Sequence, residues 1–163
     1  MLWLEFEIEG KARGKQRHRS TREGRMYTPA ETVLAENWVR LRAAEAMRAA
    51  GRAVLPGDAV IWLEVRVWVA VPASWSKKRR ALALAGGLWP LGKPDWDNYG
   101  KLVSDALNGI AWADDSQVVR AVVEKRYGEV ALTQVQIGVV EGVRIPQTWF
   151  WRAVEGHPDL YPL

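Results

Sequence analysis

The chain has 163 residues, which is enough for one domain. It has no cysteine, which excludes disulfides and cysteine-ligated zinc and makes a reducing cytoplasm the expected compartment. The net charge of +4 is modest, so the distribution of the charges is more informative than their sum. No apolar run reaches membrane-spanning length, and acids stand near the N-terminus where a signal peptide would carry bases, so we expect a soluble, untargeted cytoplasmic protein.

The first half of the chain alternates between strand and helix patterns. Residues 2–9 alternate apolar and charged side chains, which is typical of a half-buried strand, and the glycine-containing basic segment 10–28 is expected to be a loop. A helix is predicted for residues 29–50, with Thr28 as its cap. Its apolar stripe would be Val33, Leu34, Trp38, Leu41, Ala44 and Met47. Residues 59–71 give the clearest strand, whose apolar face would be Ile61, Leu63, Val65, Val67, Val69 and Val71.

The second half predicts two helices and two strands. A short helix is expected at 76–84, and a second at 97–109, capped by Asp97 or Asn98 and ended by Gly109. The apolar stripe of the second helix would be Leu102, Val103, Ala106, Leu107 and Ile110. Two strands follow, roughly residues 117–127 and 131–140, joined by a link of hairpin length. This order implies an α/β (α+β) fold in a single domain of residues 1–163: a four-stranded mixed sheet flanked by helices. The tail at 141–163 has no clear pattern.

Positive charge is concentrated in two segments. Seven of the 23 Lys and Arg residues lie between positions 11 and 25, and four more are consecutive at 77–80. A charge run is usually a solvated surface, but this spacing of bases with glycine also suits phosphate contacts. The residues expected to contact nucleic acid are Lys11, Arg13, Lys15, Arg17, Arg19, Lys77, Lys78, Arg79, Arg80 and Lys93.

Two pairs of acids bracket the helix predicted at 97–109. Asp95 and Asp97 stand two apart and would point the same way in an extended segment, and Asp114 and Asp115 follow the helix. Because a helix of about a dozen residues can return the chain, we expect both pairs to meet at one edge of the sheet. Carboxylates without His or Cys select Mg²⁺ or Mn²⁺, so a divalent ion held by these four acids is the predicted cofactor. Such an ion can bind phosphodiester oxygens and lower the pKa of a bound water.

Single residues of this group also have purely structural interpretations. Lys101, one turn after Asp97, could contact a scissile phosphate or only form an ion pair with Asp97 or Asp105. Asp97 could be only a helix cap, and Asp105 within the helix is expected to be structural. Four acids around one helix are harder to explain as caps, so the metal site remains the prediction.

The sequence "KPDWDN", followed by Lys101, "DALNG" and "DDSQVV", resembles the signature of the RusA family of Holliday junction resolvases. The resemblance extends over roughly residues 2–140, including the basic "GKARGKQRHRS" and the "YTP" before the first long helix. It implies a homodimer with an α/β fold and Mg²⁺-dependent cleavage. The essential acids of the family fall on Asp95, Asp97 and Asp115, and its functional lysine falls on Lys101. Asp114 belongs to the same motif.

From these features we expect a structure-selective DNA endonuclease that resolves four-way junctions by paired nicks in recombination and repair. A two-fold dimer would match the two equivalent strands of the junction, with no membrane partner or nucleotide cofactor. One alternative is a non-catalytic protein that binds branched DNA. Another is an Asp-x-Asp phosphatase or glycosyltransferase, although those enzymes place the pair at the end of a hydrophobic strand and here it follows a loop rich in Gly and Pro.

Overall fold

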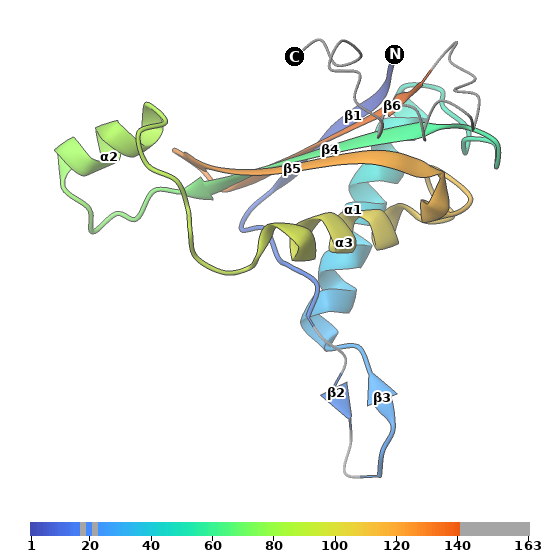
Figure 1. Cartoon of the computed structure of the whole chain (residues 1–163), viewed down its shortest axis with the longest axis horizontal. Coiled ribbons are helices and arrows are strands. Elements are labelled where there is room, and N and C mark those ends of the chain that lie inside the picture. The colour runs from blue at the N-terminus through green and yellow to red at the C-terminus, as the bar shows by residue number, and fades with distance from the viewer. Residues whose placement is uncertain (17–18, 21–22, 141–163) are drawn as a thin grey trace, which may run out of the picture.

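Four strands form one mixed sheet in the computed structural model, which describes residues 1–16, 19–20 and 23–140 (Figure 1). The strands are β1 (Leu2–Glu9), β4 (Ile61–Ala70), β5 (Val118–Gly128) and β6 (Leu132–Val139). The helices are α1 (Ala30–Ala49), α2 (Lys77–Leu84) and α3 (Trp96–Leu107), with a 3₁₀ turn, η1 (Asp115–Gln117). The order across the sheet is β1-β6-β4-β5, in which β4 and β5 are parallel and the other pairs antiparallel. The predicted four-stranded α+β fold is confirmed.

The last two strands are not neighbours, so the hairpin predicted from their short link is wrong. β4 lies between β5 and β6 and pairs with both. The apolar face of β4 explains this insertion, because Ile61, Leu63, Val65 and Val67 are each at most 2% exposed. A strand with such a face stabilises the fold most in the middle of the sheet, where neighbours on both sides keep water away from it.

Helices α1 and α3 both lie on the same face of the sheet (Figure 1). α3 packs along β5 so closely that a Cβ added to Gly100 would lie 2.9 Å from Cγ2 of Val123. The apolar stripe predicted for this helix faces the core: Leu102, Val103, Ala106 and Leu107 are buried. The absence of a side chain at one position therefore allows the helix to bring its apolar face against the sheet.

The stripe predicted for α1 is wrong, because the helix buries a different face. Its buried residues are Thr32, Val39, Ala43 and Met47, and only the last belongs to the predicted stripe. Leu34, Trp38 and Leu41 are 68%, 49% and 45% exposed. α1 carries apolar side chains on two sides, so spacing alone does not select one, and the side with the small Ala43 is the one that approaches β1 and α3. The cap is Pro29 in place of the predicted Thr28.

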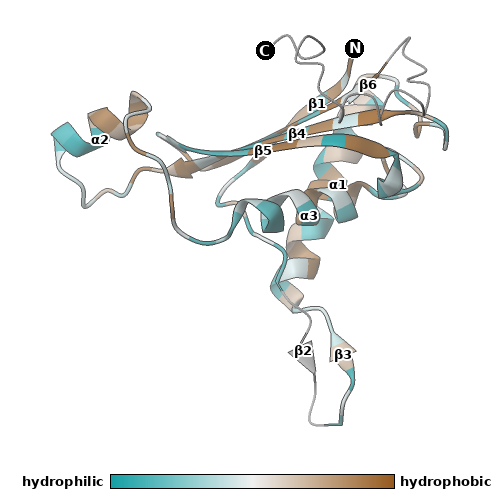
Figure 2. Ribbon diagram, viewed as in Figure 1, coloured by the Kyte–Doolittle hydropathy of each residue, from teal (hydrophilic) through white to brown (hydrophobic). Residues whose placement is uncertain are grey.

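Two charged segments project from the body of the molecule (Figure 1). One is α2, which is capped by Ser76, and the first half of this helix is hydrophilic (Figure 2). The other is a two-stranded ribbon of β2 (Arg19–Ser20) and β3 (Met26–Tyr27), within the segment expected to be a loop. No helix in the described part of the chain is long and apolar enough to cross a membrane. The first of these projections, α2, carries the exposed basic side chains of Lys77 and Lys78.

Candidate functional site

Asp95 and Asp97 lie at the start of α3. Asp95 is the residue before the first turn, in place of the predicted Asp97 or Asn98, and its carboxylate makes no capping hydrogen bond. The Asp97 carboxylate accepts a hydrogen bond from Nζ of Lys101, 3.3 Å away and one turn further on. The helix dipole favours negative charge at this end of the helix. The ion pair anticipated as the structural role of Lys101 is present, and it also holds the ammonium beside the acids.

The basic segment that follows β1 packs directly against this end of α3. The backbone N–H of Lys15 donates to the carbonyl of Asn98 at 2.9 Å. A Cβ added to Gly14 would lie 2.5 Å from Cβ of Pro94, closer than real Cβ atoms approach one another. Glycine at this position therefore lets the basic segment lie on the loop that carries Asp95.

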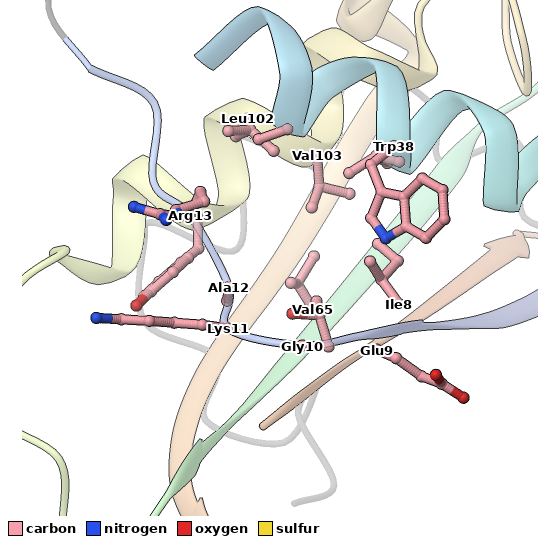
Figure 3. A pocket seen from close by; sticks show the side chains of 14 residues that line it. Ile8, Glu9, Gly10, Lys11, Ala12, Arg13, Trp38, Val65, Leu102 and Val103 are labelled. Carbon is pink, nitrogen blue, oxygen red and sulfur yellow. The ribbon is translucent and has the colours of Figure 1, made fainter. Parts of the chain in front are cut away.

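Lys11 and Arg13 point away from the core (Figure 3). They stand at the edge of a small apolar cavity of about 90 Å³, and in Figure 3 their charged ends extend in the same direction, away from Trp38. Arg13 lies 3.6 Å from the carboxylate of Glu31, and both side chains are more than half exposed. These two cations therefore face solvent, as a contact with phosphate requires.

Lys15 has a different environment from its two basic neighbours. Its ammonium forms an ion pair with Asp105 and lies 3.8 Å from Glu36, and its side chain is only 26% exposed. This contact links the basic segment to α3 and α1. The ion pair gives Asp105 the structural role expected of it, and it engages Lys15 inside the protein, although the sequence predicted a DNA contact there.

The turn that carries the second pair of acids is held by two buried side chains. Trp112 is fully buried and donates through Nε1 to Oδ1 of Asn108 at 2.8 Å. Gln117 accepts hydrogen bonds from the N–H groups of Ala113 and Asp114, and it donates to the carbonyls of Pro56 and Ala59. The turn is thereby fixed to the loop that precedes β4.

Asp114 and Asp115 are adjacent, but their carboxylates do different things. Asp114 caps η1 by accepting the N–H of Ser116 at 2.8 Å, and hydrogen bonds from Ser116 hold its pKa below the usual value. Asp115 is exposed, and its carboxylate has no hydrogen bond or ion pair within the part of the chain that the structure describes. The geometry therefore favours Asp115 as the acid that remains available for a ligand.

The two pairs of acids do not meet, so the prediction that they gather at one edge of the sheet is wrong. α3 separates them with twelve residues, a length of about 18 Å. β5 gives a second measure: Nζ of Lys125 donates to the carbonyl of Pro94 at 3.2 Å, and Lys125 lies seven residues, about 23 Å, beyond Val118. Figure 1 shows the start of α3 and the turn at η1 at opposite ends of the helix. The helix does return the chain to the sheet, but the two acidic pairs stay apart by the full length of the helix.

This separation decides whether the acids of one subunit can together bind the predicted divalent ion. Ligands of Mg²⁺ lie about 2.0–2.1 Å from the ion, so carboxylates at both ends of α3 cannot share one. Among the residues that the structure describes, no group of three or more His, Asp or Glu side chains could hold a metal. The acids of a single chain therefore do not fit the predicted site.

Three residues that shape the site were missed by the sequence analysis. Lys125 donates to the carbonyls of Gly92 and Pro94 and so holds the loop of Asp95 against β5. Gln117 and Trp112 fix the other acidic turn. A lysine in an alternating strand and a glutamine after an acidic pair carry no distinctive pattern, so only the fold reveals these roles.

The remaining predicted cations that the structure describes lie on α2, in β2 and in the loop before Asp95. Lys77 and Lys78 are exposed at the start of α2, and the guanidinium of Arg79 lies 3.8 Å above the ring of Trp75. Arg80 follows on the same helix. Arg17 lies outside the described residues, and only the backbone of Arg19, in β2, is described. Lys93 is exposed in the loop before Asp95. The described cations therefore lie beside the start of α3 and on α2.

The exposed bases beside the start of α3 and on α2 form a positive surface of the kind that binds a polyanion. The family model for endodeoxyribonuclease RusA matches residues 5–138. The chain therefore belongs to the RusA endodeoxyribonuclease family, and the matched residues include both acidic pairs and Lys101. A Bacillus subtilis (strain 168) protein, YqaN, described as uncharacterized, is 35% identical over 140 residues, which are 82% of this chain and 94% of YqaN.

Replacing Gly14 with alanine tests the packing of the basic segment on the loop of Asp95. Because the new Cβ would overlap Pro94, we expect Gly14→Ala to lower the free energy of unfolding by about 1–3 kcal/mol in urea titrations. Gly57→Ala is the matched control, since a Cβ there meets nothing within 4 Å, and we expect a change within about 0.5 kcal/mol. Equal stability of the two variants would contradict the close packing at Gly14.

Proposed function

We propose that the protein is a Mg²⁺-dependent, structure-selective endonuclease that resolves four-way DNA junctions by paired nicks in opposed strands, in recombination and repair. The observation that carries this proposal is the set of available carboxylates at Asp95, Asp97 and Asp115 in a chain of an endodeoxyribonuclease family. The bases beside the start of α3 supply the positive surface that a DNA backbone needs.

A homodimer is part of the proposal, because the acids of one subunit are too far apart to share an ion. A partner related by a two-fold axis could place its Asp115 beside Asp95 and Asp97 of the first subunit, and symmetry would repeat this arrangement at a second site. Two equivalent sites match the two equivalent strands cut in a junction. The exposed apolar side chains of α1, Leu34, Trp38 and Leu41, provide a surface that a second copy could cover.

The exposed bases would position the DNA, and the shape of the branch would determine selectivity. Lys11, Arg13 and Lys93 border the acids at the start of α3, and Lys77 and Lys78 extend the positive surface along α2. Contacts with phosphates carry no sequence information, so a surface of this kind favours recognition of DNA geometry.

One observation favours a second candidate, a non-catalytic protein that binds branched DNA. The acids of a single chain are divided between the two ends of α3, as they would be if they served only as caps and surface charges. Incubation of a labelled four-way junction with and without Mg²⁺ separates the candidates. Nicks that require the metal and that are absent from linear duplex support the nuclease, and the absence of nicks supports the binding protein.

Asp114 and Asp115 offer a matched pair of substitutions. We expect Asp115→Asn to abolish junction cleavage and leave binding intact or tighter, because an available carboxylate is lost and repulsion of phosphate falls. We expect Asp114→Asn to retain most cleavage, because asparagine caps helices as well as aspartate does. Cleavage rates with Mg²⁺ and junction affinity without it are the measurements. Equal loss of cleavage in both variants would contradict the different roles of the two acids.

The bases of α2 predict a change in the salt dependence of binding. Lys77 and Lys78 are exposed, so replacing both with alanine should reduce the slope of log affinity against log salt by about two units for every DNA form. The control is the double replacement of Arg40 and Arg42 with alanine, since these bases form ion pairs on α1. An unchanged slope in the α2 variant would mean that this helix does not touch the backbone.

A further inference from the structure

A cavity of about 350 Å³ opens beside the start of α3, within the size range of small-molecule sites. Its lining includes the apolar Val67 and Val69, the aromatic Tyr99 and Tyr127, and the cationic Lys11, Lys93 and Lys125. Lys93 stands two residues before Asp95 in the chain, so the cavity adjoins the first pair of acids.

The topology of the sheet explains why a cavity forms here. Val67 pairs with Lys125 and Val69 pairs with Tyr127, so these four side chains lie on one face near the ends of β4 and β5. α3 begins at Trp96, and the ends of both strands extend beyond the part of the sheet that it covers. There the loop before the helix covers the face, held by the hydrogen bonds from Lys125 to Gly92 and Pro94. The cavity lies between this loop, the ends of the two strands and Tyr99 of α3.

Tyr99 is the most informative residue of the lining. It is 5% exposed, yet its hydroxyl has no hydrogen-bond partner within the described residues. No side-chain oxygen or nitrogen in this part of the chain is both fully enclosed and without a partner, so the hydroxyl is not fully enclosed. Tyr99 lines both this cavity and the smaller one beside Arg13. Burial raises the pKa of this phenol, which therefore stays protonated at neutral pH and can donate a hydrogen bond.

The other aromatic side chain is fixed in place. The ring of Tyr127 packs edge-on against Trp75, with ring centres 5.2 Å apart and planes at 63°. A fixed ring beside apolar valines suits a flat heterocycle, and the unpartnered hydroxyl offers a donor to an acceptor on its edge. Lys11 and Lys93 also line the cavity, and their ammonium groups make no hydrogen bond or ion pair within the described residues, so they suit a phosphate attached to such a heterocycle. The combination has the chemistry of a nucleotide site.

We propose that this cavity accepts one unstacked nucleobase of the DNA strand whose phosphate lies at Asp95 and Asp97. The inference rests on the proposed function, since it requires a DNA strand at the acids, and it adds the cost of unstacking one base of that strand. Stacking against Tyr127 and a hydrogen bond from Tyr99 offset the cost of taking the base out of the helix. The cavity thereby holds the strand in register with the acids.

Four-way junctions with a single abasic nucleotide test this proposal. The abasic position is moved one nucleotide at a time across the crossover, and each junction is measured for affinity without divalent metal and for cleavage rate with Mg²⁺. With the wild-type protein, we expect one position beside the cut to weaken affinity and cleavage by about tenfold, the loss of one stacked base.

A variant that fills the cavity provides the matched test. Val69→Phe adds a ring to the lining, and Val122→Phe makes the same change on β5, at an exposed residue outside the cavity. We expect the Val69→Phe protein to bind and cut the intact junction as weakly as the wild-type protein binds and cuts the junction with the abasic nucleotide at the sensitive position. For this variant, an abasic nucleotide at that position should lower affinity and cleavage rate no further. We expect Val122→Phe to behave as wild type. Circular dichroism and thermal melting establish that both variants are folded.

Tyr99→Phe keeps the ring and removes only the hydroxyl, so it tests the cavity even if Val69→Phe does not fold. We expect it to reduce discrimination among the four bases at the sensitive position, whereas Tyr27→Phe, in β3, should not. Normal cleavage without any sensitive position, or a folded Val69→Phe that acts as wild type, would overturn the cavity proposal alone. If the protein cuts no junction but its affinity is still lowered by an abasic nucleotide at one position, the nuclease function is overturned and the proposal that the cavity binds a base is supported.

Discussion

The parallel pairing of β4 with β5 determines where the acids of this chain can lie. Parallel neighbours need a crossover, and here α3 forms the last part of that crossover by running back along β5. Its first residues therefore lie near the end of β5, and the turn that follows it lies at the beginning of that strand. The acids before and after α3 are held apart by the length of a rigid helix, and no local rearrangement of loops can bring them together.

This constraint places the candidate site residues at two ends of the molecule. One end combines Asp95, Asp97 and Lys101 with the basic segment after β1 and with the aromatic cavity between β4, β5 and α3. The other end presents Asp115 on a turn fixed by Gln117 and Trp112. Each end is supported by hydrogen bonds, and neither end alone brings together all the acids of the predicted metal site. In the proposed dimer, a second copy would bring the missing acids to both ends.

Local patterns in the sequence were sufficient for the three helices and for the four strands of the main sheet, but not for the short ribbon of β2 and β3. The alternation in β1 and β4 and the apolar stripe of α3 are strong because one face of each element is apolar and the other is polar. α1 failed this test because both of its sides carry apolar residues, and the small Ala43, not the large Trp38, faces the core. The order of β5 and β6 could not be read from the length of their link, because burial of β4 overrides it.

For the candidate site, too, the sequence predicted which residues belong to it but not how the fold arranges them. The residue types and their spacing identified the acids, Lys101 and the basic segments, and the family match covers these positions. Their arrangement depended on the direction of α3 relative to β5, which a helix pattern does not contain. The capping role of Asp114, the ion pair of Lys15 and the support from Lys125 likewise arise from contacts between distant segments.

The central claim is that each active site combines acids from two subunits, and mixing two inactive variants tests it most directly. Asp97→Asn and Asp115→Asn subunits are combined, heterodimers are verified by native mass spectrometry, and a supercoiled plasmid carrying a four-way junction is the substrate. If the sites are shared, each heterodimer has one site with both changes and one intact site, so the mixture should nick the plasmid to open circles although neither variant does so alone. If each subunit held its own complete site, every site in the heterodimer would carry one change. Heterodimers that bind the junction and leave the plasmid supercoiled would contradict the account.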